Sequence, residues 1–163
     1  MNGTIIDRVP RDAPGAAEIG FVIEDTYNAS TVLFDNIARG RGDHPAVIGP
    51  GGSYAELCRE ACLWGNALAR MDIKRGGRIL LFLDDTPLYP AALFGAIRAG
   101  FVLVLVNTLT PPDLINFYLK DSAAEAAIVD AAFAEKFDAP LASTPRCVES
   151  WSRMAMCRQL RPI

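Results

Sequence analysis

The chain has 163 residues, of which 51% are hydrophobic, with a net charge of -3 and a pI near 5.1. This length fits one domain and is short for a complete two-substrate enzyme. The charge balance gives no electrostatic reason to expect nucleic acid or an anionic membrane as a partner. No apolar run reaches the roughly 18–20 residues that span a bilayer. Because residues 1–8 also lack the pattern of a secretion signal, a cytoplasmic location is expected.

The N-terminal third shows one helical pattern among irregular segments. Val32, Leu33 and Ile37 recur at helical spacing, and Gly40 would end that helix. The pattern predicts an extended lead-in over 1–26, a helix over 29–39, a short strand over 46–48 and a tight turn over 49–52.

A second helix should begin at Ser53. Ser53 and Glu56 have the spacing of a capping box, in which each residue bonds the backbone N–H of the other. The helix should run to about Met71. Its buried side should carry Leu57, Ala61, Trp64, Leu68 and Met71.

A strand–helix–strand unit follows. Apolar strands are predicted over 79–83 and 101–106, and both need cover on each face in a parallel sheet. Between them, Thr86 as N-cap and Pro87 at the first helical position should open a helix that Gly100 ends. This helix is rich in Ala and Gly, so it can lie close against the sheet.

The same alternation continues to residue 137. Thr110 and the prolines after it repeat the cap-plus-proline pattern, for a helix reaching about Asp121. A strand over 126–129 and a short helix over 131–137 complete an α/β pattern, a partial doubly wound, largely parallel sheet flanked by helices. We expect a subdomain over 27–138, preceded by the lead-in over 1–26 and followed by a divergent, proline-punctuated tail over 139–163.

Polar residues follow two of the predicted strands. Asp84 and Asp85 could bind a metal there, since ligands gather at strand carboxyl ends. A solvated loop pair is the preferred interpretation, because no third ligand is identifiable. Asn107 and Thr108 also follow a strand, where a turn that satisfies its own backbone is the simpler interpretation.

Other candidate sites point to packing rather than chemistry. The glycine-rich loop over 49–53 lacks the spacing of a phosphate loop, and its proline removes one N–H donor. His44 is the only histidine, so a hydrolytic triad with Ser30, Ser53 or Ser122 is not supported. The cysteines favour buried, reduced thiols over a zinc site; they are Cys58, Cys62, Cys147 and Cys157.

Three stretches in order resemble the N-terminal region of adenylate-forming acid–CoA ligases. They cover residues 34–46, 53–57 and 95–109, and the sequence Leu-Asp-Asp-Thr-Pro over 83–87 is similar to a strand end of benzoate and related aryl-CoA ligases. The resemblance extends over roughly 27–137. One departure lies within 102–106, where the family often places a proline and this chain has none.

The resemblance implies a reaction in which an acid and ATP form an acyl-adenylate, and CoA then displaces AMP. ATP, Mg and CoA would serve the full-length family, and a small aromatic or aliphatic carboxylic acid would be the substrate. The family's lysine-ended phosphate loop and catalytic lysine lie downstream of the matching region. The resemblance therefore assigns this chain no catalytic, cofactor-binding or metal-ligating residue, and we expect the chain by itself to be inactive.

Two alternatives remain open from the sequence. A non-catalytic binding or assembly module derived from this fold would keep an apolar flank and an open sheet edge, which favour self-association. A small nucleotide-binding α/β protein is the third interpretation, which titration with ATP and AMP would separate from the others.

Overall fold

The fold was determined as a computed structural model that describes residues 27–49, 51–137 and 147–149. The helices are α1 (Thr31–Ala38), α2 (Tyr54–Ala69), α3 (Leu88–Ala99), α4 (Pro112–Asp121) and the 3-10 helix η2 (Ala131–Phe137). The strands are β1 (Arg78–Phe82), β2 (Val102–Leu105), β3 (Ala126–Val129) and β4 (Cys147–Glu149).

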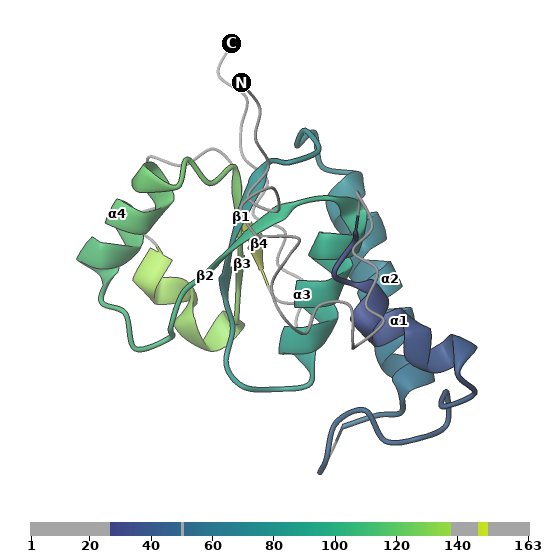
Figure 1. The fold of residues 1–163 in the computed structure, drawn as a ribbon. Coiled ribbons are helices and arrows are strands. Elements are labelled where there is room, and N and C mark those ends of the chain that lie inside the picture. The colour runs from purple at the N-terminus through teal and green to yellow at the C-terminus, as the bar shows by residue number, and fades with distance from the viewer. Residues whose placement is uncertain (1–26, 50, 138–146, 150–163) are drawn as a thin grey trace, which may run out of the picture.

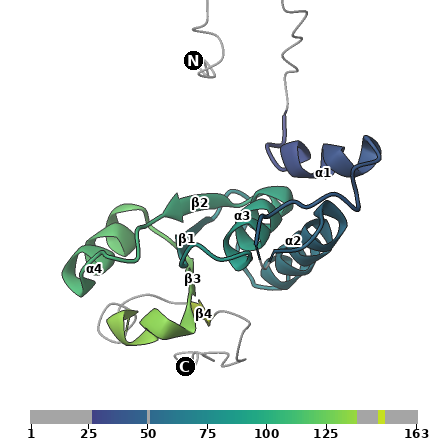
Figure 2. The same cartoon turned by 90° about the horizontal axis from the view of Figure 1, so that it is seen from below.

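The four strands form one parallel sheet in the order β2-β1-β3-β4. Helix α3 connects β1 to β2 on one face, and α4 connects β2 to β3 on the other, so β1 lies between the strands that follow it (Figures 1 and 2). This arrangement confirms the expected α/β class, a parallel sheet flanked by helices. The predicted pattern named no strand within 139–163, where β4 lies.

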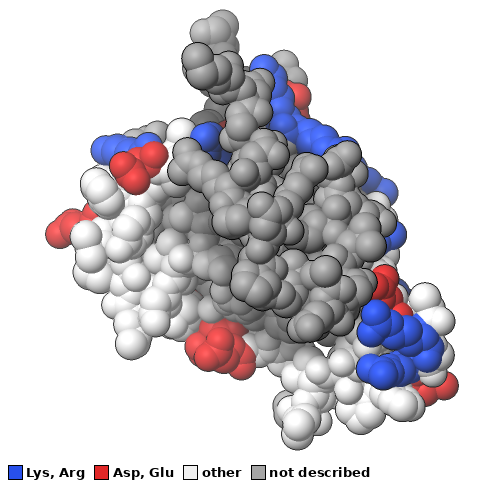
Figure 3. Space-filling model, in the orientation of Figure 1, with Lys and Arg blue, Asp and Glu red and all other residues white. Residues whose placement is uncertain are grey.

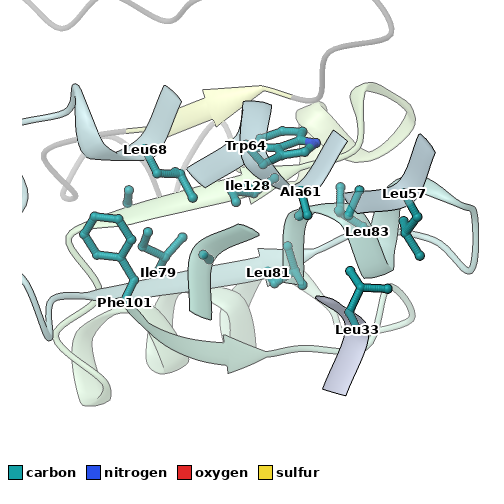
Figure 4. Packing of buried hydrophobic residues seen from close by; sticks show 14 of the residues in the cluster. Leu33, Leu57, Ala61, Trp64, Leu68, Ile79, Leu81, Leu83, Phe101 and Ile128 are labelled. Carbon is teal, nitrogen blue, oxygen red and sulfur yellow. The ribbon is translucent and has the colours of Figure 1, made fainter. Parts of the chain in front are cut away.

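Each face of the sheet has its own apolar core. On the first face, side chains of α2 point toward Ile79, Leu81 and Ile128 of the strands, as Figure 4 shows. On the second face, Leu80 and Phe82 pack against Ile115 and Leu119 of α4 and against η2. Alternation along β1 sends successive side chains to opposite faces, so this one strand contributes to both cores.

Helices α2 and α3 approach each other at two glycines. A Cβ atom on Gly95 would lie 2.5 Å from the carbonyl oxygen of Ala61 and 2.7 Å from the Cβ of Trp64. A Cβ atom on Gly65 would lie 2.9 Å from the carbonyl oxygen of Gly95. The prediction that small residues bring α3 close to the sheet holds for the buried Ala92 and Ala96, whereas Gly95 serves the contact with α2.

The predicted capping box of α2 is confirmed. The Ser53 N–H donates to Glu56 Oε2 at 2.8 Å, and the Glu56 N–H donates to Ser53 Oγ at 3.3 Å. Of the residues expected on its buried side, Met71 lies beyond the end of the helix at Ala69 and is half-buried.

Two other helix starts differ from expectation. Neither α3 nor α4 has a side-chain cap, and the residues at their N-cap positions are Pro87 and Pro111 rather than Thr86 and Thr110. Proline supplies a suitable φ but no side-chain acceptor, so these helices begin through backbone geometry alone. Gly100 does end α3, with a φ of 86°.

The expected strand over 46–48 is wrong. Pro45 and Ser53 form a single antiparallel bridge, and residues 46–49 form a loop in which Ile48 is 98% exposed. Among the residues that the structure describes, no strand pairs with this loop over several residues, so its apolar residues do not add to the sheet. In α1, Leu33 is buried, whereas Val32 and Ile37 are exposed.

Candidate functional site

The structure brings two of the polar pairs expected from the sequence to one edge of the sheet. Asp84 and Asp85 follow β1, and Asn107 and Thr108 follow β2, which runs parallel to β1. With Tyr89 of α3 they line a shallow depression of about 220 Å³. Ligands of open α/β sheets bind at this edge, beyond the carboxyl ends of the strands.

Local hydrogen bonds determine the shape of both loops. Asn107 Oδ1 accepts the Leu109 N–H at 2.7 Å, and the Asn107 carbonyl accepts the Thr110 N–H at 3.0 Å. The Asp84 carbonyl accepts the Thr86 N–H at 2.8 Å. Asn107 therefore forms the self-satisfied turn that the sequence predicted, and the exposed carboxylates of Asp84 and Asp85 belong to a solvated loop.

Lys136 supports this edge and was missed by the sequence analysis. From η2, its Nζ donates to the Thr108 carbonyl at 2.7 Å and to the Thr110 carbonyl at 3.4 Å. The ammonium group also lies 5.8 Å and 5.6 Å from the ring centroids of Phe82 and Phe133, within reach of cation–π attraction. No local signal marks this lysine, because its partners lie 26 and 28 residues earlier in the chain.

The hydroxyl candidates serve structural roles. Ser30 is buried, Ser53 belongs to the capping box, and Ser122 Oγ donates to the Tyr118 carbonyl at 2.6 Å. His44 is exposed in the loop before α2. Ser53 lies beside Pro45, the neighbour of His44, but among the hydrogen bonds of the described residues none joins Ser53 or Ser122 to the His44 ring.

The helical cysteines are free thiols. Cys58 is buried and Cys62 is half-buried on α2. Burial raises the pKa of the Cys58 thiol, and the neighbouring Cys62 raises it further. A thiol with a raised pKa is a poor nucleophile near neutral pH, in keeping with a packing role. The side chains of Cys147 and Cys157 lie outside the described residues.

Within the described ranges, no three His, Cys, Asp or Glu residues gather as a metal site would require. No helix there is both long and apolar enough to cross a membrane. The carboxyl edge of β1 and β2 offers hydrogen-bond acceptors and hydroxyl groups to a polar ligand. It does not bring together a nucleophile, a base that activates it and a set of oxyanion donors.

Comparison with known proteins identifies the family. The model of the family described as AMP-binding enzyme matches residues 34–158. A 4-hydroxybenzoate–CoA/benzoate–CoA ligase of Rhodopseudomonas palustris is 37% identical over 122 residues, which are 73% of this chain and 23% of that protein. A long-chain-fatty-acid–CoA ligase of Salmonella typhimurium is 32% identical over 141 residues, 85% of this chain and 24% of that protein.

Solved structures agree with this assignment. A benzoate CoA ligase from Burkholderia xenovorans superposes with a TM-score of 0.70 at 31% identity, covering 77% of this chain and 26% of that one. The anthranilate CoA ligase AuaEII, solved with anthranoyl-AMP, gives a TM-score of 0.71 at 26% identity and covers 78% of this chain and 26% of that one. The chain thus spans about a quarter of the length of these relatives. It belongs to the AMP-binding enzyme family and corresponds to the N-terminal region of an acid–CoA ligase.

Proposed function

We propose that this chain serves as the N-terminal scaffold of an ATP-dependent acid–CoA ligase, which converts an acid, ATP and CoA into acyl-CoA, AMP and pyrophosphate. The observation that carries this proposal is the family match over 34–158, supported by the TM-scores of 0.70 and 0.71 with the solved benzoate and anthranilate ligases. ATP, Mg and CoA would then be bound by the complete ligase.

The substrate we propose is a small aromatic or aliphatic carboxylic acid. Relatives of this chain are named for benzoate, hydroxybenzoate and long-chain fatty acids, which share a carboxylate and an apolar body. No nucleic acid or membrane partner is proposed, and a cytoplasmic location remains our expectation. The division into 1–26, 27–138 and 139–163 also stays a prediction; β4 and the end of the family match lie within its third part.

We propose further that these 163 residues do not form an acyl-adenylate unaided. Stabilising the charge that develops during attack on the α-phosphate requires preorganised cationic and N–H donors. The sequence contains no loop rich in Ser, Thr and Gly that ends in Lys. The carboxyl edge of β1 and β2 carries two carboxylates, which repel a triphosphate.

Acid-dependent exchange of pyrophosphate into ATP tests this proposal. The purified chain should give no exchange with benzoate, 4-hydroxybenzoate or a fatty acid. The Rhodopseudomonas palustris ligase, assayed in parallel with benzoate, is the positive control. Exchange by this chain above the no-acid background would contradict the proposal.

A second candidate function is a self-associating module without catalysis. The observation in its favour is the exposure of apolar side chains on β2, where Val102 is 51% exposed and Leu105 is 55% exposed. Exposed apolar strand edges favour association with another chain. Light scattering tests this candidate, and a monomer at every concentration would exclude it.

A further inference from the structure

The outer edge of β2 is an uncharged, apolar strand edge. Strand β2 ends the sheet order, and no other strand of the described residues pairs with its outer side. The four residues of β2 are Val and Leu only, whereas strands β1 and β3 on the interior of the sheet are almost wholly buried. Edge strands that are protected against association with another chain usually carry a lysine, a proline or a bulge. Strand β2 has none of these.

Opposite charges predominate at the two ends of this edge, although each end also holds one group of the other sign. At the carboxyl end the Nζ of Lys136 donates to the Thr108 carbonyl, and at the amino end Glu125 lies beside Gly77. Lys74, Arg75 and Arg78 are exposed beside the amino end of β2, where the Gly76 N–H donates to the Gly100 carbonyl at 2.8 Å. Asp84 and Asp85 are exposed beside its carboxyl end, in the depression they share with Leu105. In Figure 3 blue side chains follow the upper right rim and a red group lies at the lower centre, while a further blue group lies at the lower right.

We propose that β2 pairs with β2 of a second copy of this chain, antiparallel and around a two-fold axis. This inference rests on the self-associating function proposed above and assigns its surface. Antiparallel strands exchange main-chain hydrogen bonds along the whole edge, and a two-fold axis closes the assembly at two copies. The reversed direction places the basic end of each β2 beside the acidic end of the other.

Charge complementarity favours the antiparallel over the parallel arrangement of the two copies. Two parallel edges would place basic residues beside basic residues and carboxylates beside carboxylates, which is unfavourable. In the antiparallel arrangement the basic end of one β2 lies beside the acidic end of the other, and the two-fold axis produces this attractive contact twice. This arrangement also covers Val102 and Leu105, the two most exposed side chains of the strand.

Molar mass by light scattering, measured over a series of protein concentrations, tests the surface. The unmodified chain should be a dimer, and the double variant Val102→Lys, Leu105→Lys should be a monomer with unchanged far-ultraviolet circular dichroism. Ile48→Lys is the matched control, because Ile48 is apolar and 98% exposed but lies in the loop before α2. That control should remain a dimer.

A charge exchange tests the antiparallel orientation. Arg75→Glu or Asp85→Arg alone should weaken the dimer by about three- to tenfold, because each variant brings like charges together at both ends. The variant with both substitutions should recover most of the affinity. A double variant as weak as the single ones would overturn the antiparallel arrangement.

The outcomes separate this inference from the function on which it rests. If the chain is monomeric at every concentration, both the self-associating function and the β2 surface are overturned. The same holds if it associates only with the downstream part of a ligase and not with itself. A dimer that the lysine variants leave intact overturns the β2 surface but not self-association. None of these measurements depends on adenylate formation, so they do not bear on the ligase proposal.

Discussion

Ala123 ends α4 in the left-handed region of backbone space, with a φ of 49°. The Ala123 N–H donates to the Lys120 carbonyl at 3.1 Å, and the Ala124 N–H donates to the Leu119 carbonyl at 3.1 Å. These two bonds form a Schellman motif, whose left-handed position usually holds glycine. The end of α3 has the same pair of bonds with Gly100 at that position.

We expect Ala123→Gly to stabilise the fold by about 0.5–1 kcal/mol, because the relief of left-handed strain exceeds the added freedom of the unfolded chain. The matched substitution Gly100→Ala should destabilise the fold by about 1–2 kcal/mol or more. Urea denaturation of the two variants checks both signs. Equal effects of the same sign would contradict this account of the two helix ends.

Glu56 makes stability depend on pH through the cap of α2. Hydrogen bonds from the Ser53 backbone and hydroxyl lower the pKa of this carboxyl below its ordinary value of 4.5. A carboxyl with a lowered pKa in the fold adds stability above its unfolded pKa and loses it as the pH falls through the folded value. The added stability should therefore be complete at neutral pH, begin to decline as the pH falls below about 4.5 and be lost once the pH is below the lowered pKa.

Glu56→Gln isolates this contribution. The variant should be less stable than the unmodified chain at pH 7, and the difference should shrink as the pH falls below 4.5, because protonated Glu56 also lacks the charge. Free energies of unfolding at pH 7 and at pH 3 provide the measurement. A difference of the same size at both values would contradict the assigned role of the carboxylate.

At the scale of elements, the contact between α2 and α3 depends on Gly95. The carbonyl oxygen of Ala61 occupies the space that a Cβ atom on Gly95 would need. The three atoms nearest to that position are the Ala61 carbonyl oxygen, the Trp64 Cβ and the Gly65 backbone nitrogen, and none of them can rotate away as the end of a long side chain can. A methyl group there forces the helices apart.

Gly95→Ala should therefore destabilise the fold by about 1–3 kcal/mol, despite the better helix propensity of alanine. Gly42→Ala is the control, because a Cβ atom on Gly42 would have only ordinary contacts of 3.8 Å and 3.9 Å. Thermal denaturation compares the two variants. A Gly95→Ala variant as stable as the unmodified chain would show that the two helices adjust without cost.

At the scale of the whole molecule, one strand joins two cores. Leu80 packs on the α4 face of the sheet, and its neighbour Leu81 packs on the α3 face with Trp64. Because both cores share β1, a substitution that destabilises one core should also destabilise the other. The molecule should then unfold as one cooperative unit.

Leu80→Ala tests this coupling from the face opposite Trp64. The cavity should lower the free energy of unfolding by about 2–5 kcal/mol. In a Trp151→Phe background, Trp64 is the remaining tryptophan. Its fluorescence and the circular dichroism should then shift to the same urea midpoint. Separate midpoints would show that the two faces unfold independently.

The sequence by itself determined which segments form the main elements and which polar pairs follow the strands. Patterning, the capping box at Ser53 and the glycine after α3 are local signals, so they identified the α/β class without a structure. Asp84 and Asn107 were each expected after a strand, and the structure brings them to one edge because the carboxyl ends of the parallel strands β1 and β2 coincide.

Only the tertiary structure decided which strand ends the sheet, that Gly95 contacts α2 and that Lys136 holds the loop after β2. Each of these depends on segments far apart in the chain, whose contacts leave no periodic or capping signal in either segment. The expected strand over 46–48 failed for the same reason. Three apolar residues become a strand only where a neighbouring strand pairs with them, and that neighbour is chosen by the packing of the whole chain.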